Sequence, residues 1–151
     1  MKKVRFIIIV TAFLLLNFDS VLGCVCVSAT IPQKIEQAHT VFSGEVIGRT
    51  ATKIRFKVQK WWKGTPYYEI FIYADSKVIT SCDVSFKKGE TYLVYAFRSS
   101  PENKLETNEC TGTKELTAAD EDLKILGKGK PPTRKMPRIR KRRSSQANYF
   151  S

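Results

Sequence analysis

The chain has 151 residues, a formal net charge of +12 and four cysteines. The charge is uneven, because residues 24–127 carry fourteen basic and thirteen acidic side chains, whereas residues 128–151 carry nine basic and no acidic ones. The excess positive charge therefore belongs to the C-terminal segment, and the overall charge does not indicate a nucleic-acid-binding domain.

The N-terminus, residues 1–23, has the pattern of a secretory signal peptide. Basic residues precede an apolar run of eleven residues at 6–16, and Val21 and Gly23 occupy the two positions where signal peptidase requires small residues. The run is shorter than the roughly 20 residues of a membrane-spanning helix. A bacterial lipoprotein signal is a minor alternative, but lipidation of Cys24 would leave an odd number of cysteines. We expect a secreted mature protein that begins at Cys24.

The cysteines of the mature chain predict two disulfides, since an even number behind a signal peptide is typical of an oxidising compartment. They are Cys24, Cys26, Cys82 and Cys110. Of the three possible pairings, the one that joins Cys24 to Cys26 would be strained across one intervening residue. The other two remain open, and each ties the N-terminus to distant parts of the chain through loops worth about 4 kcal/mol per bridge.

The mature chain up to residue 127 is predicted to form one domain. Hydrophobic patterns and turn residues predict helices at 32–38 and 118–126, and strands at 40–47, 53–61, 67–73, 91–97 and 105–110. In the second strand, Ile54, Phe56 and Val58 alternate with polar residues, as in a half-buried strand. Thr117 is expected to cap the last helix, and Gly127 to end it.

These elements predict a mainly β protein, a five-stranded antiparallel barrel with two short flanking helices. The OB-fold is the leading candidate, although periodicity alone does not separate a barrel from a β-sandwich. From Lys128 onward, prolines stand among lysines and arginines with few apolar residues. Residues 128–151 are therefore predicted to be a disordered basic tail.

Cleavage before Cys24 would give this residue a free α-amino group. Its amine nitrogen and carbonyl oxygen could form a five-membered chelate with a catalytic zinc that keeps an open coordination position. An α-amino pKa of about 7.7–8.0 makes deprotonation easy at neutral pH. Disulfides on either side would hold Val25 in an extended ridge and lower the entropic cost of docking.

The chain also resembles a known family. Cys-x-Cys at the mature N-terminus, followed by a Pro-Gln helix and the sequence VFSGEV at 41–46, resembles the inhibitory N-terminal domain of the tissue inhibitors of metalloproteinases. The resemblance covers about residues 24–127. It implies a netrin-like OB-fold and a secreted, monomeric inhibitor of zinc metalloendopeptidases, with no cofactor of its own.

By this resemblance, Cys24 chelates the zinc of the target proteinase and Val25 enters its primed-side specificity pocket. The implied target-binding residues are the N-terminal stretch and a supporting loop: Cys24, Val25, Cys26, Val27, Ser28, Ala29, Thr80 and Ser81. The implied disulfides are Cys24–Cys82 and Cys26–Cys110.

The sequence departs from the family pattern at three points. Glu36 stands where the first half of a third disulfide would be, and Pro32-Gln33 comes one residue late. The cysteine-rich C-terminal domain is absent. The alternative function is a non-inhibitory netrin-like extracellular module that binds proteins or glycosaminoglycans.

An enzyme is not expected. His39 is the only histidine, and neither the H-E-x-x-H nor the G-x-S-x-G motif occurs. We expect His39 to be structural. We also expect the aromatic pairs Trp61-Trp62 and Tyr67-Tyr68 to be partly exposed core residues at strand ends rather than a binding patch.

The basic run near the C-terminus has three interpretations: retention in extracellular matrix through sulfated glycosaminoglycans such as heparan sulfate, cleavage by a furin-like protease at 140–143, or a solubilising tail. We favour matrix retention. The predicted polyanion-binding residues are Arg134, Lys135, Arg138, Arg140, Lys141, Arg142 and Arg143. No nucleic-acid partner and no membrane span are expected.

Overall fold

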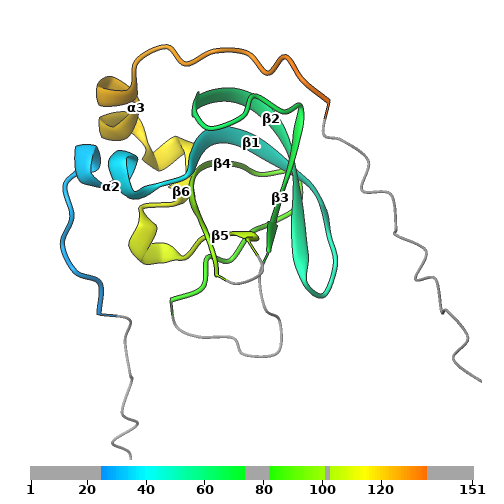
Figure 1. Ribbon diagram of the computed structural model, residues 1–151, viewed down its shortest axis with the longest axis horizontal. Helices are drawn as coiled ribbons and strands as arrows, with labels where there is room; N and C mark the ends of the chain where they lie inside the picture. Colours follow the sequence, from blue (N-terminus) through cyan, green and yellow to red (C-terminus); the bar gives the residue numbers. More distant parts are fainter. Residues whose placement is uncertain (1–24, 74–81, 101–102, 136–151) are drawn as a thin grey trace, which may run out of the picture.

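The structure is a computed structural model that describes residues 25–73, 82–100 and 103–135 (Figure 1). Its strands are β1 (Thr40–Arg49), β2 (Lys53–Lys63), β3 (Glu69–Tyr73), β4 (Thr91–Arg98), β5 (Leu105–Glu106) and β6 (Lys114–Glu115). Its helices are α2 (Ile31–Gln37) and α3 (Asp120–Leu126), with 3₁₀ turns η1 (Glu109–Thr111) and η2 (Leu116–Ala118). The predicted signal peptide lies outside the described residues.

Five strands close into a barrel. The sheet order is β1-β2-β3-β5-β4, and β1 pairs with β4 to complete the ring, while β6 extends the sheet beyond β4. All of these pairings are antiparallel except the contact of β3 with β5, which is parallel. This confirms the predicted five-stranded OB-type barrel and excludes the β-sandwich.

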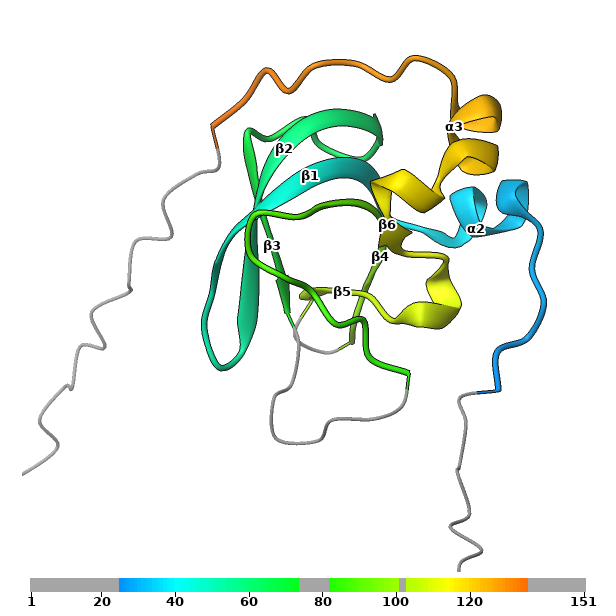
Figure 2. The ribbon, with the colours of Figure 1, turned by 180° about the vertical axis from the view of Figure 1, so that it is seen from behind.

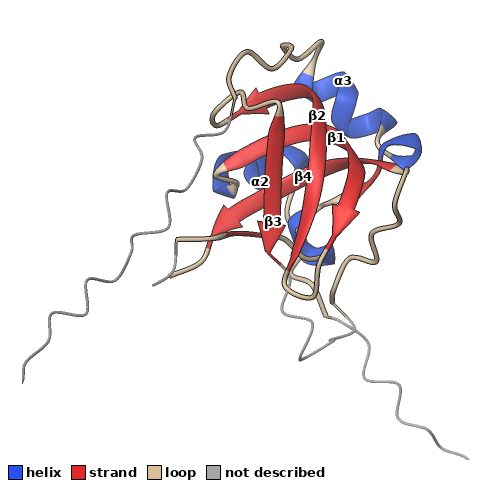
Figure 3. Ribbon diagram, turned by 90° about the vertical axis from the view of Figure 1, so that its right-hand side faces the viewer, coloured by secondary structure: helices blue, strands red, loops and turns tan. Residues whose placement is uncertain are grey.

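β2 and β3, which lie side by side in Figure 3, alternate in burial along their length as their sequences require. Ile54, Phe56 and Val58 of β2 are buried in the barrel, and the polar residues between them are exposed. β4 is apolar nearly throughout because it is buried on both faces. The predicted fifth strand is wrong in its extent, since only its first two residues are strand and η1 follows.

β1 is bent, and it pairs with both β2 and β4. Its register with β2 shifts at three places, one of them between Ser43 and Gly44. At Gly44 the backbones come so close that a Cβ would lie 2.9 Å from the carbonyl oxygen of Lys57. A glycine is therefore required where β1 bends against β2.

The protein has two apolar clusters on either side of β4. The first fills the barrel with residues including Phe42, Phe56, Phe86, Tyr92 and Val94. The second lies between the barrel and the helices and contains Ala38, Val41, Leu93, Tyr95 and Ala119. Figure 2 shows α2 and α3 together on the side of the barrel where this second cluster lies. The helices are too short to be stable alone, so packing on β4 stabilises them.

The start of α2 is defined by its sequence. Pro32 occupies the first turn, as predicted, and the structure adds a capping box formed by Thr30 and Gln33. At the other end, the Lys63 Nζ donates to the carbonyl oxygens of Ile35 (2.8 Å) and Glu36 (2.7 Å). This contact places a positive charge at the carboxyl end of the helix, where the helix dipole favours it.

The predicted start of the last helix is wrong by two residues. Thr117 lies within η2, and α3 begins after Ala119, which offers no side-chain cap. Gly127 ends the helix with a positive φ of 72°, as expected.

Asp122 of α3 is the buried charged residue of this helix. It is 1% exposed and accepts hydrogen bonds from the hydroxyl of Tyr95 on β4 (2.7 Å) and from the Nζ of Lys114 on β6 (2.7 Å). These bonds satisfy both carboxylate oxygens and join the helix to two strands.

Residues 127–135 form an extended segment, here called the strap, that runs across the barrel from α3. It bridges Trp61 through Lys130 and Tyr67 through Arg134. The prediction that disorder begins at Lys128 is therefore wrong for this part of the tail. The remainder, 136–151, lies outside the described residues. Among the described residues, no helix has the length and apolar character needed to cross a membrane.

Replacing Asp122 with alanine should destabilise the fold. The change leaves the buried Tyr95 hydroxyl without its acceptor and removes the partner of Lys114, so we expect a loss of about 2–4 kcal/mol in unfolding free energy. Urea denaturation measures it. Asp120→Ala, an exposed change on the same helix, should cost no more than about 1 kcal/mol. Equal losses in the two variants would contradict the role of the buried bonds.

Tyr95 should give the protein a specific alkaline sensitivity. Burial, and then the hydrogen bond to Asp122, raise the pKa of its hydroxyl above the ordinary value. A raised folded-state pKa means that its contribution is complete below the unfolded pKa of about 10 and is lost as the pH rises above it. Unfolding free energy should therefore fall more steeply above about pH 10 in the wild type than in Tyr95→Phe. The exposed-residue control Tyr68→Phe should follow the wild type; parallel curves for all three would exclude the effect.

Candidate functional site

Residues 25–29, here called the N-terminal ridge, project from the barrel before α2. Val25 is 95% exposed and Val27 is 90% exposed, which is unusual for large apolar side chains. Between them, Cys26 forms a disulfide with Cys110, with a Cα–Cα distance of 5.2 Å. The ridge is thus a solvent-exposed segment, largely apolar, that is covalently anchored at Cys26, its second residue.

The anchor point belongs to a rigid turn. Cys110 lies in η1, where the Asn108 side chain accepts a hydrogen bond from the backbone N–H of Thr111 (3.1 Å). Gly112 ends the turn with a φ of 97°, a conformation that favours glycine. The turn that holds the disulfide is therefore fixed at both ends.

Threonine hydroxyls join this turn to β4. The Thr107 hydroxyl donates to the carbonyl oxygen of Tyr95 (2.7 Å), and it lies 2.9 Å from the Thr111 hydroxyl and 2.6 Å from the Thr113 hydroxyl. Thr113 in turn accepts from the backbone N–H of Tyr95 (2.9 Å). Movements of the ridge anchor are thus opposed by a hydrogen-bond network on the central strand.

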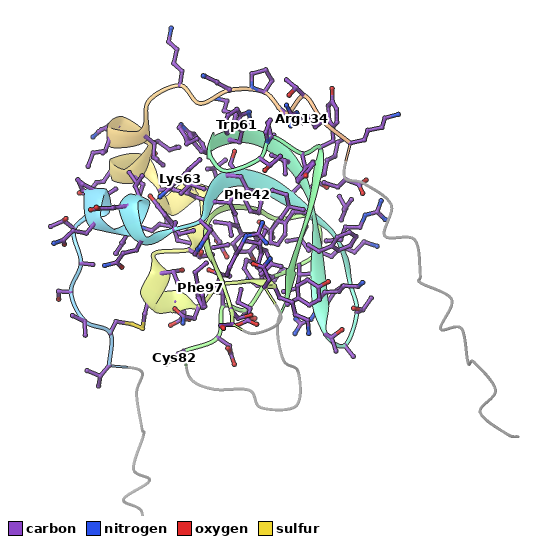
Figure 4. All side chains as sticks on the ribbon, in the orientation of Figure 1. Phe42, Trp61, Lys63, Cys82, Phe97 and Arg134 are labelled. Atoms are coloured by element: carbon purple, nitrogen blue, oxygen red, sulfur yellow. A yellow bond between two sulfur atoms is a disulfide. The ribbon has the colours of Figure 1, made fainter. Side chains whose placement is uncertain are left out.

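Cys82 lies beside the same turn. Its carbonyl oxygen accepts a hydrogen bond from the backbone N–H of Glu109 (2.9 Å), and its sulfur is in a disulfide. In Figure 4, Cys82 and the Cys26–Cys110 bond lie at the same end of the barrel. The structure therefore brings together the ridge, Cys82 and Cys110, three segments that are far apart in sequence.

A pocket of about 170 Å³ opens next to the disulfide. It lies between α2, β4 and η1 and is lined by Lys34, Gln37, Ala38, Tyr95, Ala96, Phe97, Cys110 and Thr111. Lys34 contributes the only charged side chain of this lining. The pocket adds a concave surface next to the convex ridge.

The predicted target-binding residues are only partly within the described residues. Val25, Cys26, Val27, Ser28 and Ala29 form the ridge, as predicted. The others, Cys24, Thr80 and Ser81, lie outside the described residues. The predicted pairing Cys26–Cys110 is confirmed.

Two of the predicted polyanion-binding residues lie within the described residues, and the others lie outside them. Arg134 and Lys135 are exposed on the strap, which crosses the top of the barrel in Figure 1, far from Cys82 at the bottom in Figure 4. The remaining five, Arg138, Arg140, Lys141, Arg142 and Arg143, lie outside the described residues.

Two further expectations concern structural roles. The Nδ1 of His39 accepts a hydrogen bond from the backbone N–H of Arg98 (3.1 Å), so this histidine links the start of β1 to the end of β4. Trp61 and Trp62 are half-buried and donate from their indole N–H groups to carbonyl oxygens of the strap. Within the described residues, no group of three or more His, Cys, Asp or Glu side chains is placed to hold a metal ion.

Sequence reasoning missed several parts of the site. The threonine network and the pocket combine residues from α2, β4 and η1, and no spacing in the sequence marks them. The only sequence signal was the polar, threonine-rich composition of 107–113 around Cys110.

No family model fits the sequence, and no curated protein is similar enough to be matched with it. Functional inference therefore depends on the geometry of the site and on the motif-level resemblance described above.

Removing the Cys26–Cys110 bridge should release the ridge. The double variant Cys26→Ser/Cys110→Ser opens a loop with a sequence separation of 84. We expect a loss of about 2–5 kcal/mol in unfolding free energy, together with faster proteolytic cleavage within residues 25–29. Limited proteolysis followed by mass spectrometry measures the second effect. Val27→Ser, which alters the ridge but keeps the bridge, should retain wild-type resistance; if the double variant also did so, the bridge would not be the anchor.

Proposed function

We propose that this protein is a secreted inhibitor of zinc metalloendopeptidases that acts through its N-terminal ridge. The observation that carries the proposal is the exposed Val25-Cys26-Val27 segment, anchored by a disulfide to the closed barrel. The resemblance of the Cys-x-Cys start to the tissue inhibitors of metalloproteinases supplies the mode of action.

The shape and exposure of the ridge suit a proteinase cleft. A cleft binds an extended peptide, and the described residues 25–29 adopt no helix or strand of their own. Burial of a side chain such as Val25 on binding would contribute about 1.5–3 kcal/mol. Because the bridge to Cys110 restricts the ridge before it binds, less conformational entropy is lost on docking.

The second bridge of the proposal joins Cys24 to Cys82. Cys82 is disulfide-bonded, and once Cys26 and Cys110 are paired with each other, Cys24 is the remaining cysteine of the sequence. The backbone N–H of Glu109 donates to the carbonyl oxygen of Cys82, and this hydrogen bond holds Cys82 close to Cys110, the residue after Glu109. Two adjacent bridges would fix the first residues of the mature chain relative to the barrel.

Zinc chelation is assigned to Cys24. Its α-amine and carbonyl oxygen are nitrogen and oxygen donors of the kind that zinc accepts, and they would occupy the position of the attacking water on the target's metal. Val25 would then point into the adjacent specificity pocket. Thr80 and Ser81, the two residues that directly precede Cys82, would support the ridge from its side.

The missing third disulfide has a non-covalent counterpart. Glu36 stands at the position of the absent cysteine, and its carbonyl oxygen accepts a hydrogen bond from the Nζ of Lys63. This bond and the one to Ile35 hold the end of α2 to β2. The helix that follows the ridge is therefore held in place without that bridge.

An additional alanine before Cys24 should abolish inhibition. The extension converts the α-amine into an amide nitrogen that no longer binds zinc, and it shifts the chelating group by one residue. We expect the inhibition constant against a panel of zinc metalloendopeptidases to rise by at least about a hundredfold, which is some 2.7 kcal/mol of binding free energy. Steady-state inhibition assays measure it, after N-terminal sequencing of the secreted protein.

The matched control carries the extra alanine at the C-terminus and should inhibit like the wild type. Both proteins should show the same thermal unfolding, because the extension leaves the barrel unchanged. Undiminished inhibition by the N-terminally extended protein would refute chelation by Cys24. Absence of inhibition by a wild type with a verified Cys24 terminus would favour the non-inhibitory netrin-like module.

A further inference from the structure

The strap is built into the barrel surface through the two tryptophans of β2. Trp61 exchanges backbone hydrogen bonds with Lys130 in both directions (2.9 Å each), and its indole N–H donates to the carbonyl oxygen of Pro131 (3.0 Å). The Trp62 indole N–H donates to the carbonyl oxygen of Gly127 (3.0 Å). The strap is thus held at its start and at its middle.

The far end of the strap pairs with the turn between β2 and β3. The backbone N–H groups of Thr133 and Arg134 donate to the carbonyl oxygen of Pro66 (2.9 and 3.0 Å), and that of Tyr68 donates to the carbonyl oxygen of Arg134 (2.8 Å). Strap residues and the end of β2 therefore form one continuous surface.

The charge on this surface has a single sign. Neither 56–68 nor 127–135 contains an acidic residue. Five exposed basic side chains come from the two segments, and none forms an ion pair with any described residue: Lys60, Lys128, Lys130, Arg134 and Lys135. Two other lysines of these segments are left out of the set. The Nζ of Lys63 is hydrogen-bonded to carbonyl oxygens of α2, and Lys57 lies opposite Glu45 and Glu69 in the sheet register.

We propose that Lys60, Lys128, Lys130, Arg134 and Lys135 form a folded binding surface for a linear sulfated polysaccharide. The strap is extended, so its cations are spread along its length rather than gathered at one point, which suits the repeated sulfates of such a chain. The surface goes beyond a flexible basic tail, because the two tryptophans hold Gly127, Lys130 and Pro131 of the strap beside β2 before any ligand binds. Preorganisation lowers the entropic cost of binding.

The aromatic side chains favour a polysaccharide over a single-stranded nucleic acid. Binding of unpaired bases relies on free aromatic faces for stacking. The Lys130 Nζ lies 5.8 Å from the centre of the Trp61 ring, and a Cβ at Gly129 would lie 2.7 Å from the Trp62 ring. Both indoles are therefore already in contact with the strap, and the neighbouring Tyr68 is about half exposed, so five cations and one exposed tyrosine are what the surface offers.

The surface and the N-terminal ridge are on different parts of the barrel. In Figures 1 and 2 the strap crosses the top of the molecule, whereas the ridge descends beside α2. A polysaccharide bound along the strap would leave the ridge free to contact a second protein. Polysaccharide binding itself does not depend on the proposed inhibitory function.

The test compares two triple variants of the full secreted chain with the same change in charge. Lys60→Gln/Lys128→Gln/Lys130→Gln removes cations from the proposed surface, and Lys87→Gln/Lys88→Gln/Lys124→Gln removes exposed cations elsewhere. We expect the first variant to bind immobilised heparin about tenfold more weakly, with a shallower salt dependence, because fewer counterions are released. The second should elute close to the wild type, and thermal unfolding should be unchanged in both.

Equal elution of the two variants would overturn the proposal, because it would assign heparin binding to the C-terminal run or to net charge alone. The proposal would also fail if single-stranded DNA or vesicles of anionic lipid bound the wild type more tightly than heparin at the same ionic strength. A selective loss in the first variant, with heparin as the preferred ligand, would establish the folded surface.

Discussion

The pairing of β1 with both β2 and β4 is the constraint on which the rest of the structure depends. It closes the barrel, and it is possible because β1 bends where Gly44 lets the backbone approach Lys57. Closure leaves β4 buried on both faces, with Tyr92 and Val94 in the barrel and Leu93 and Tyr95 outside it. The outer face of β4 is then the surface on which the two helices pack.

Each flanking element is attached to the barrel by a different interaction. α3 is joined to β4 by the buried Asp122 carboxylate, and α2 is joined to β2 by the two carbonyl contacts of Lys63. The ridge depends on a covalent bond to Cys110, whose turn is in turn hydrogen-bonded to β4 through threonines. An exposed apolar segment gains no stability from burial in the free protein, so a covalent anchor is the physical means of keeping it in place.

Much of the fold could be predicted because its signals are local. The alternation of Ile54, Phe56 and Val58 defines which face of β2 is buried, and Thr30, Pro32 and Gln33 define the start of α2. Local signals failed where the decisive partner is distant. Thr117 has the composition of a cap, but α3 begins later, where Asp122 can reach Tyr95 and Lys114.

The strap is a clearer case of a segment whose structure depends on partners that are distant in the sequence. Its composition of glycine, proline and lysine predicts disorder, because such a segment buries little surface by itself. Its order comes from Trp61 and Trp62, which lie 70 and 65 residues away from the carbonyl groups that they bind. Of the candidate site, the sequence could predict the exposed ridge and the pairing implied by the family resemblance, but not the pocket or the threonine network, which exist only once β4 and η1 are folded together.

The tryptophans also explain how a neutral domain and a basic segment form one molecule. A free tail of like charges would move independently of the barrel and would present its cations in many arrangements. The indole donors of Trp61 and Trp62 are directed at strap carbonyls, and Gly129, with a φ of 64°, lets the backbone pass against the Trp62 ring. Any side chain at this position would have to displace the ring, so the glycine and the two tryptophans form a single structural unit. Because that unit contacts β2 and the turn before β3, and the ridge is anchored at η1, the barrel separates the basic segment from the ridge.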